Sequence, residues 1–202
     1  MLRTLATASV LALGLSGAAS AATLFSDDFE SYALGTPSSL SPTWTVAPGT
    51  IDVIGALNGF NWWGPGQYID LNGTPDSAAM ITANVSGLNI GSMYNLAFNY
   101  GFNRNSGPNE TLVFGAGSTT GTLGLADFSA LGATFGYKVL TFQATASSMS
   151  IFFQDTNNPA DVDLGGPVID NVSVAAVPLP AAGLLLLGAL SGLAVWRRRK
   201  TV

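Results

Sequence analysis

The sequence has 202 residues, of which 48% are hydrophobic and only 9% charged, and it contains neither cysteine nor histidine. Without these two residue types the chain has no disulfide, no thiol nucleophile, no Ser-His-Asp triad and no ordinary zinc site. The formal net charge of −5 disfavours binding to the phosphate backbone of nucleic acids.

The first residues have the layout of a secretory signal peptide. Arg3 supplies a positive n-region, residues 5–15 form an apolar h-region, and Ala-Ser-Ala at 19–21 is a small-residue cleavage site. This apolar segment is too short to be a membrane span. We expect cleavage after Ala21, so that residues 1–21 are removed and 22–176 form the mature domain. Its 155 residues suit one domain with one core.

The acidic residues are concentrated in that domain. Residues 22–176 contain all 12 Asp and Glu residues but only two of the seven basic residues, Arg104 and Lys138. The domain charge is therefore 2 minus 12, or −10, against −5 for the whole chain. An acidic surface of this kind repels nucleic acid, and its carboxylates suit divalent cations.

The domain shows short alternating segments separated by Gly, Pro, Asn, Asp and Ser, the residues that form turns. The clearest segment is Met93–Phe102, whose period of two predicts a strand with one buried and one wet face. The other expected strands are Leu24–Phe29, Thr43–Ala47, Ile51–Ile54, Tyr68–Leu71, Ala78–Val85, Glu110–Phe114, Tyr137–Ala144, Met149–Gln154 and Val168–Val174.

Helical periodicity inside the domain is confined to Leu123–Leu131, and Gly115–Gly124 is expected to be a loop. Roughly ten short strands in one domain predict an all-β fold, a two-sheet antiparallel jelly-roll sandwich.

The last expected strand contains an acidic residue where an apolar one is expected. Alternation along Val168–Val174 places Asp170 on the same face as Val168 and Val172. If that face is the core, a carboxylate lies at its margin, and a buried charge pairs, changes its pKa or binds a metal. A calcium ion is one candidate partner. The alternative is that Asp170 accepts backbone N–H bonds.

Both ends of the domain resemble a known fold family. The opening Phe25-Ser26-Asp27-Asp28-Phe29-Glu30 and the closing Gly166-Pro167-Val168-Ile169-Asp170-Asn171-Val172 are similar to the first and last strands of galactose-binding-like jelly-roll domains, which include several families of carbohydrate-binding modules. Gln67–Leu71 resembles a further strand. The resemblance implies that Glu30 and Asp170, with Asp28 as a third candidate, lie close together and hold a structural calcium ion.

Aromatic residues are the other candidates for ligand binding. Trp62 and Trp63 lie in the loop-like segment Phe60–Gly66, and sugar rings bind aromatic faces. Adjacent residues of an extended chain point in opposite directions, so we expect at most one exposed indole; alternatively, both close the end of the sandwich. Arg104, in the amide-rich loop Asn103–Glu110, is a further sugar-binding candidate, and a solvated hairpin loop is its alternative.

The chain ends with an apolar segment and a basic cluster. Val177–Trp196 contains 20 residues without a charge, and at about 1.5 Å per residue a helix of this length spans a hydrocarbon core of about 30 Å. The basic cluster directly after it favours a cytoplasmic C-terminus and comprises Arg197, Arg198, Arg199 and Lys200.

This C-terminal layout resembles the PEP-CTERM class of bacterial sorting signals, specifically the VPLPA-CTERM variant. The motif residues are Val177, Pro178, Leu179, Pro180 and Ala181. The resemblance implies that the secretion machinery exports the protein, and that a membrane-embedded exosortase recognises residues 177–202 as a sorting signal. The enzyme would remove this tail and pass the protein to the cell surface or its extracellular polymer. An ordinary single-pass tail anchor is the alternative.

The sequence leaves three functions open. The favoured one is an exported surface or matrix protein that associates with exopolysaccharide through a non-catalytic jelly-roll domain. The second is a structural surface protein that binds no sugar. The third is a glycan-cleaving enzyme that uses two carboxylates, although no sequence motif pairs two acidic residues.

Overall fold

The computed structural model describes residues 21–37, 40, 42–55, 62–75, 77–105, 107–156 and 165–178. Residues Ala21–Val177 form one compact unit. Residues 1–20 of the expected signal peptide, residues 179–196 of the C-terminal apolar segment and the basic cluster lie outside the described residues. Three of the five motif residues are among them. In the part of the chain that is described, no helix combines the length and apolar character needed to cross a membrane.

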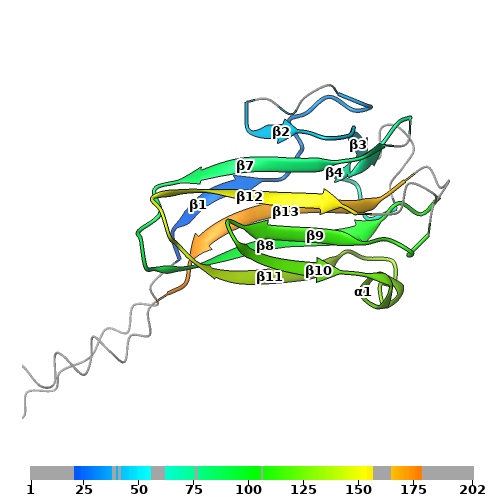
Figure 1. The fold of residues 1–202 in the computed structure, drawn as a ribbon. Helices are drawn as coiled ribbons and strands as arrows, with labels where there is room; N and C mark the ends of the chain where they lie inside the picture. The colour runs from blue at the N-terminus through cyan, green and yellow to red at the C-terminus, as the bar shows by residue number, and fades with distance from the viewer. Residues whose placement is uncertain are drawn as a thin grey trace, which may run out of the picture. The chain divides into compact units, whose positions relative to one another are not determined.

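The described strands form two antiparallel sheets that lie face to face (Figure 1). The six-stranded sheet has the order β11-β8-β13-β4-β3, and β1 also pairs with β13. Its strands are β1 (Thr23–Asp27), β3 (Asp52–Gly55), β4 (Gln67–Asp70), β8 (Met93–Phe102), β11 (Gly136–Gln143) and β13 (Pro167–Ala176). Every pairing in it is antiparallel.

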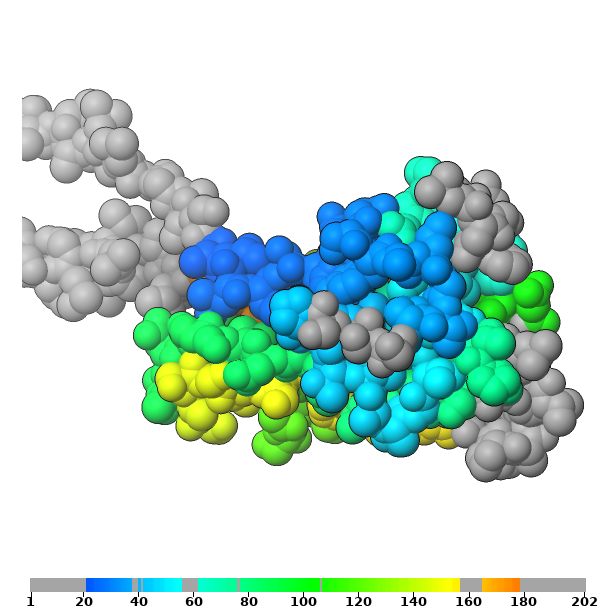
Figure 2. Space-filling model, turned by 90° about the horizontal axis from the view of Figure 1, so that it is seen from above, coloured from blue at the N-terminus to red at the C-terminus, as the bar shows by residue number. Residues whose placement is uncertain are grey.

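The five-stranded sheet has the order β10-β9-β12-β7-β2. Its strands are β2 (Trp44–Val46), β7 (Met80–Ser86), β9 (Leu112–Ala116), β10 (Thr119–Leu123) and β12 (Ser148–Asp155). A small ladder joins β5 (Asn72–Gly73) to β6 (Ser77–Ala78). The two-sheet antiparallel sandwich predicted from the sequence is therefore confirmed. Figure 2 shows the N-terminal third of the described chain, in blue and cyan, spread over one face of the molecule.

The core lies between the two sheets. Alternate residues of β8 point into it, as the period of two predicts. Tyr94, Leu96 and Phe98 are at most 2% exposed. The Phe98 ring meets Phe114 and Phe153 of the opposite sheet edge-on, with ring centroids 4.8 Å apart in both pairs. Because aromatic side chains bury large apolar areas, these contacts across the sandwich contribute strongly to holding the sheets together.

The prediction of a loop at Gly115–Gly124 is wrong. β9 continues to Ala116, the chain turns at Gly117, whose φ is +56°, and β10 returns along β9. β10 is an edge strand of Thr and Gly with few apolar residues, so the hydrophobic alternation that would predict a strand is missing. The expected helical segment contains α1 (Leu125–Ser129).

A bulge in β13 changes the direction of Asp170. Ile169 and Val172 both belong to the core between the sheets, although strict alternation would place them on opposite faces. The pairing of β13 with β8 shifts register between Asp170 and Ser173, and Asn171 adopts a φ of +50°. The expectation that Asp170 shares a face with Val172 is therefore wrong, because the extra residue of the bulge separates them. Asp170 lies on the outer face of the six-stranded sheet.

Candidate functional site

A second apolar cluster lies on the outer face of the six-stranded sheet, at one end. Ile54, Tyr68 and Val168 alternate with core residues along β3, β4 and β13, so their side chains lie on the opposite side of the sheet from the main core. Together with Trp63 they are at most 5% exposed, and Phe135 packs against them. This outer cluster closes one end of the sheet against solvent.

Trp63 is fixed at the centre of this outer cluster. Its Nε1–H donates to the Phe102 carbonyl oxygen at 2.8 Å, and its ring stacks on Phe135 at 5.4 Å between centroids. Gly101 lies against the indole, and the Arg104 Cζ atom is 4.5 Å from the ring centroid. Trp63 is 5% exposed, which agrees with the alternative that this residue closes the end of the sandwich. These contacts leave little of its ring for stacking on a ligand.

Beside the outer cluster lies a hollow of about 280 Å³, which we call the aromatic pocket. It is lined by Glu30, Trp63, Gly64, Pro65, Gly66, Tyr68, Asn99, Phe135, Asp170 and Asn171. Aromatic edges, two amides and two carboxylates thus converge on one concave site. A concave site that combines aromatic surface with a few fixed polar groups can receive a small ligand.

Glu30 reaches this pocket because the segment after β1 is clamped to β4. Its Oε1 accepts the Gln67 N–H at 2.7 Å, and the Gln67 Nε2–H donates to the Glu30 carbonyl oxygen at 2.8 Å. Gly66 permits this approach, since a β-carbon there would lie 2.5 Å from Glu30 Oε1. The reciprocal bonds hold an otherwise exposed carboxylate at the pocket rim.

Asp170 is the buried carboxylate of the pocket and is 8% exposed. Its two oxygens accept the backbone N–H and the Nδ2–H of Asn171, each at 2.6 Å. The pKa of Asp170 is raised to about 6, chiefly because the carboxyl group is buried. The negative charges of Glu30 and Asp28 act in the same direction, whereas the two bonds from Asn171 oppose the rise. The backbone bond from Asn171 is the bond that the sequence offered as the alternative to calcium.

The structure brings two of the three predicted calcium ligands to one pocket. Glu30 and Asp170 both line the aromatic pocket, whereas Asp28 is exposed and lines the neighbouring hollow. Two carboxylates that repel one another supply the negative charge and the oxygen ligands that a calcium ion prefers. No group of three or more acidic side chains among the described residues is placed to hold a metal ion. The calcium ion therefore stays a prediction.

The neighbouring hollow, which we call the hydroxyl pocket, has a volume of about 590 Å³. It is lined by Ser26, Asp27, Asp28, Ser31, Tyr32, Thr43, Asn171, Val172 and Ser173. Asp27 is committed to structure, because its carboxylate accepts bonds from the Tyr32 hydroxyl and the Trp44 indole N–H. Asn171 lines both pockets, so the two hollows meet at the bulge of β13.

A row of three side chains crosses the outer face of the sheet beside the aromatic pocket. Tyr137 of β11 pairs with Asn99 of β8, and Asn99 pairs with Asp170 of β13. Directly paired residues project to the same face, and adjacent strands are about 4.8 Å apart. Tyr137 is 67% exposed. The row therefore presents an open aromatic face, an amide and a carboxylate in sequence.

Tyr137 and Asn99 were missed as site residues, although both lie on predicted strands. Tyr137 and Val139 are the large hydrophobic residues among the exposed positions of β11, and Lys138 between them is half-buried. An aromatic residue on the wet side of a strand was the available signal. Tyr137 lies beside Asn99 because β11 and β8 are neighbours in the sheet, and a local sequence pattern does not predict which strands are neighbours.

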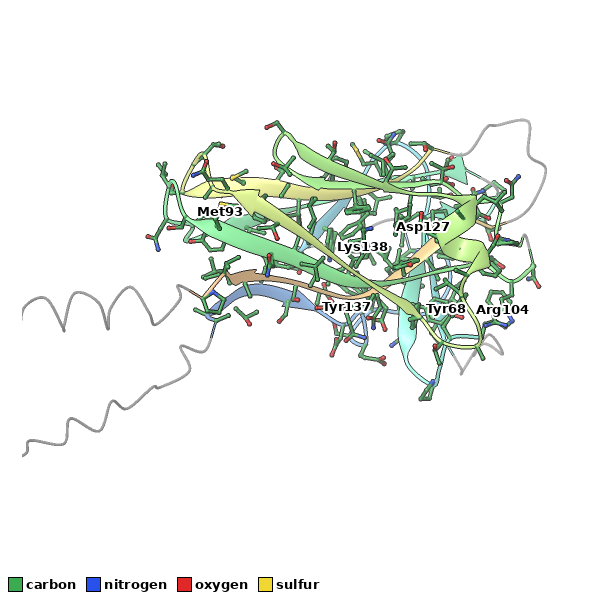
Figure 3. All side chains as sticks on the ribbon, turned by 90° about the horizontal axis from the view of Figure 1, so that it is seen from below. Tyr68, Met93, Arg104, Asp127, Tyr137 and Lys138 are labelled. Atoms are coloured by element: carbon green, nitrogen blue, oxygen red, sulfur yellow. The ribbon has the colours of Figure 1, made fainter. Side chains whose placement is uncertain are left out.

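Of the remaining predicted sugar-binding residues, Trp62 is half-buried and Arg104 is exposed. Arg104 Nη2–H donates to the Gly132 carbonyl oxygen at 3.0 Å, while its guanidinium lies over Trp63. Figure 3 places Arg104 and Tyr68 at one end of the sandwich and Met93 at the other. Neither Trp62 nor Arg104 lines the aromatic pocket.

Asp70 is a second buried carboxylate, 1% exposed and outside both pockets. It accepts the N–H groups of Asn72 and Gly166, each at 2.9 Å, and the Asn103 Nδ2–H at 2.7 Å. Burial raises its pKa to about 8, against the opposing effect of these bonds. The carboxyl group joins the end of β4 to the segments that follow β8 and precede β13, which is a structural task.

The described chain also includes the first two residues of the sorting motif. The Val177 N–H donates to the Met93 carbonyl oxygen at 2.9 Å, and Pro178 is exposed. Leu179, Pro180, Ala181 and the cluster from Arg197 to Lys200 lie outside the described residues. Ala21, the expected cleavage position, is the first described residue, so the sorting and cleavage assignments stay predictions.

Comparison of the sequence with protein-family models and with curated proteins gave no match. Solved structures give matches to the fold. A family 35 carbohydrate-binding module from Clostridium thermocellum is 14% identical, with 65% of this chain and 90% of the module covered and a TM-score of 0.42. The xylan-binding CBM22-1 domain from Paenibacillus barcinonensis is 14% identical, with 79% and 97% covered and a TM-score of 0.49.

The enzymatically active domain of tailspike protein 4 from bacteriophage CBA120 is 18% identical, with 67% of this chain covered and a TM-score of 0.45. The chain spans about a fifth of that protein's length, 19%. Because these TM-scores lie below 0.5, we base no functional inference on them. The likeness is one of fold: an antiparallel β-sandwich similar to carbohydrate-binding modules.

Proposed function

We propose that this protein is exported, sorted to the cell surface or extracellular matrix, and associates with extracellular polysaccharide through a non-catalytic jelly-roll domain. The observation that carries the sugar-binding part is the row of Tyr137, Asn99 and Asp170 beside the aromatic pocket. Sugars offer apolar C–H faces and many hydroxyls, so an open aromatic ring followed by an amide and a carboxylate matches both surfaces of a pyranose.

Retention of the full chain, purified in detergent, on immobilised polysaccharides tests this proposal. Replacing Tyr137 by alanine should abolish or strongly weaken the retention, since the stacking surface is lost. Ile90 is 70% exposed and contributes to neither pocket, so Ile90→Ala is a matched control that should bind normally. If no polysaccharide retains the protein, the structural role without sugar binding replaces our proposal.

The pairing of Glu30 with Asp170 keeps one catalytic function under consideration. Glycoside hydrolysis needs two carboxyl groups, one of which holds a proton near neutral pH, and Asp170 has a raised pKa in the same pocket as Glu30. Sensitive detection of reducing ends after incubation with the bound polysaccharide distinguishes the two functions. Turnover that disappears in both Glu30→Gln and Asp170→Asn would make the protein an enzyme.

The sorting part of the proposal rests on the order of motif, apolar segment and basic cluster. Mass spectrometry of the C-terminus of protein isolated from intact cells should show that the basic cluster has been removed. Scrambling residues 177–181 while keeping their composition should leave the unprocessed chain in the membrane. Unchanged surface delivery of the scrambled chain would favour an ordinary route without an exosortase.

A further inference from the structure

The aromatic pocket and the hydroxyl pocket are neighbouring hollows beside β13, and we call the two together the depression. Both are lined by Asn171, the residue of the β13 bulge whose φ is +50°. The aromatic pocket has ring edges and two amides, while the hydroxyl pocket has Ser26, Ser31 and Thr43 in its wall. A ligand longer than one sugar unit can therefore contact both hollows. Such a ligand could be an internal stretch of a polysaccharide, with its two ends outside the hollows.

The charge of this depression has one sign. Asp28 and Asp27 line the hydroxyl pocket, Glu30 and Asp170 line the aromatic pocket, and no basic side chain lines either hollow among the described residues. The guanidinium of Arg104, beside the outer cluster, lies over Trp63 and donates to Gly132. Glu30 Oε1 is engaged by the Gln67 N–H, and its other oxygen has no hydrogen-bond partner within the described residues.

We infer that this depression binds an internal stretch of a polysaccharide that carries free amino groups. The inference rests on the proposed function and names its ligand class. A protonated amine on one sugar would donate to Glu30 and Asp170, and bonds between ammonium and carboxylate are the stronger, charge-assisted type. Hydroxyls of the next sugar would bond to the serine and threonine side chains of the hydroxyl pocket. Uronic acid and sulfated polymers are repelled by the same four carboxylates.

An ammonium group would reduce the repulsion between the carboxylates of the aromatic pocket, whereas a neutral sugar would not. Asp170 is buried close enough to Glu30 and Asp28 for their charges to disfavour its ionised form. A cation between them relieves that repulsion, and the domain itself has only two cationic side chains to offer. Calcium would supply the same positive charge from another source, so the experiment includes it as a separate arm.

The test is calorimetric titration of the full chain in detergent with three hexasaccharides of glucosamine, of N-acetylglucosamine and of galacturonic acid. In EDTA at about neutral pH, we expect glucosamine hexasaccharide to bind at least about tenfold more tightly than the acetylated one. The uronate should not bind. Equal affinity for the amine and its acetylated form would overturn this inference and leave glycan binding intact. No binding of any of the three, together with no retention on polysaccharides, would remove both.

Variants locate the effect. Glu30→Gln and Asp170→Asn should each erase the preference for the amine, whereas Asp127→Asn on α1, in neither pocket, is the charge-matched control and should keep it. Asp28→Asn should weaken binding of the glucosamine hexasaccharide more than binding of a glucosamine disaccharide titrated in the same way, because only the longer ligand reaches the hydroxyl pocket. Binding of the glucosamine ligand that requires added calcium would assign the positive charge to the metal and overturn the inference.

Discussion

The indole ring of Trp63 lies directly against Gly101 of β8, where a β-carbon would come within 2.6 Å of Trp63 Cε2. The contact explains why a glycine interrupts the most regular strand of the domain. It also fixes the wall of the aromatic pocket, because Trp63 and Phe135 stack on one another above the strand.

We expect Gly101→Ala to displace Trp63 and to destabilise the fold by about 1–3 kcal/mol, the usual effect of overpacking. Thermal unfolding followed by tryptophan fluorescence measures both consequences. Gly132→Ala is the control, because a β-carbon there meets nothing within 4 Å. Equal stability of the two variants would show that the contact between Trp63 and Gly101 relaxes without loss.

Arg104 should contribute modestly to the same region. Arg104→Ala removes the guanidinium above Trp63 and its bond to Gly132, and we expect a loss of about 1 kcal/mol, since exposed cation–π contacts contribute about 0.5–1 kcal/mol. Lys138→Ala removes the other cation of the domain away from Trp63 and serves for comparison. A larger loss for Lys138→Ala in urea unfolding would contradict this assignment.

The stability of the domain should decrease as pH rises from about 4 to about 8. The pKa of Asp70 is raised from 3.8 to about 8 in the folded protein, because the carboxyl group is buried. Between those values the folded state keeps a proton that the unfolded chain has released, so each increase in pH favours unfolding. The raised pKa of Asp170, about 6, acts in the same direction at the acidic end of this range.

Asp70→Asn removes the titrating group and should flatten the dependence of melting temperature on pH between about 6 and 8. Its stability should be lower at all pH values, because an amide nitrogen in place of Oδ2 would face the Asn103 Nδ2–H donor. An unchanged slope in this variant would show that another group is responsible for the pH dependence.

Calcium should raise the melting temperature if Glu30 and Asp170 bind it in the folded state. A ligand that binds only the folded protein stabilises it by mass action, so adding calcium to EDTA-treated protein should increase the temperature in proportion to the logarithm of calcium concentration. Asp170→Ala should remove this response. Identical melts with EDTA and with calcium would leave Asp170 held by Asn171 alone, as its two bonds already allow.

The sequence predicted the strands better than it predicted their faces. β8 was predicted with its observed ends because its alternation is unbroken over ten residues, whereas Asp170 was assigned to the wrong face because the bulge at Asn171 has no hydrophobic signature. The resemblance to galactose-binding-like domains predicted that Glu30 and Asp170 lie close together, and both residues line the aromatic pocket. Tyr137 was overlooked because its importance comes from its partner strand. Pairing between distant strands is a tertiary property that local periodicity does not contain.

β13 begins at the end of the sandwich that holds the outer cluster and finishes at Ala176, where Val177 is bonded to Met93 at the opposite end. A polymer gripped near Asp170 and an attachment at the C-terminus would therefore pull on this strand lengthwise. The ladders that join β13 to β1 and β8 would be loaded in shear, so their hydrogen bonds would resist together instead of opening one after another. The strand that shapes the site is thus also the one oriented to withstand mechanical tension.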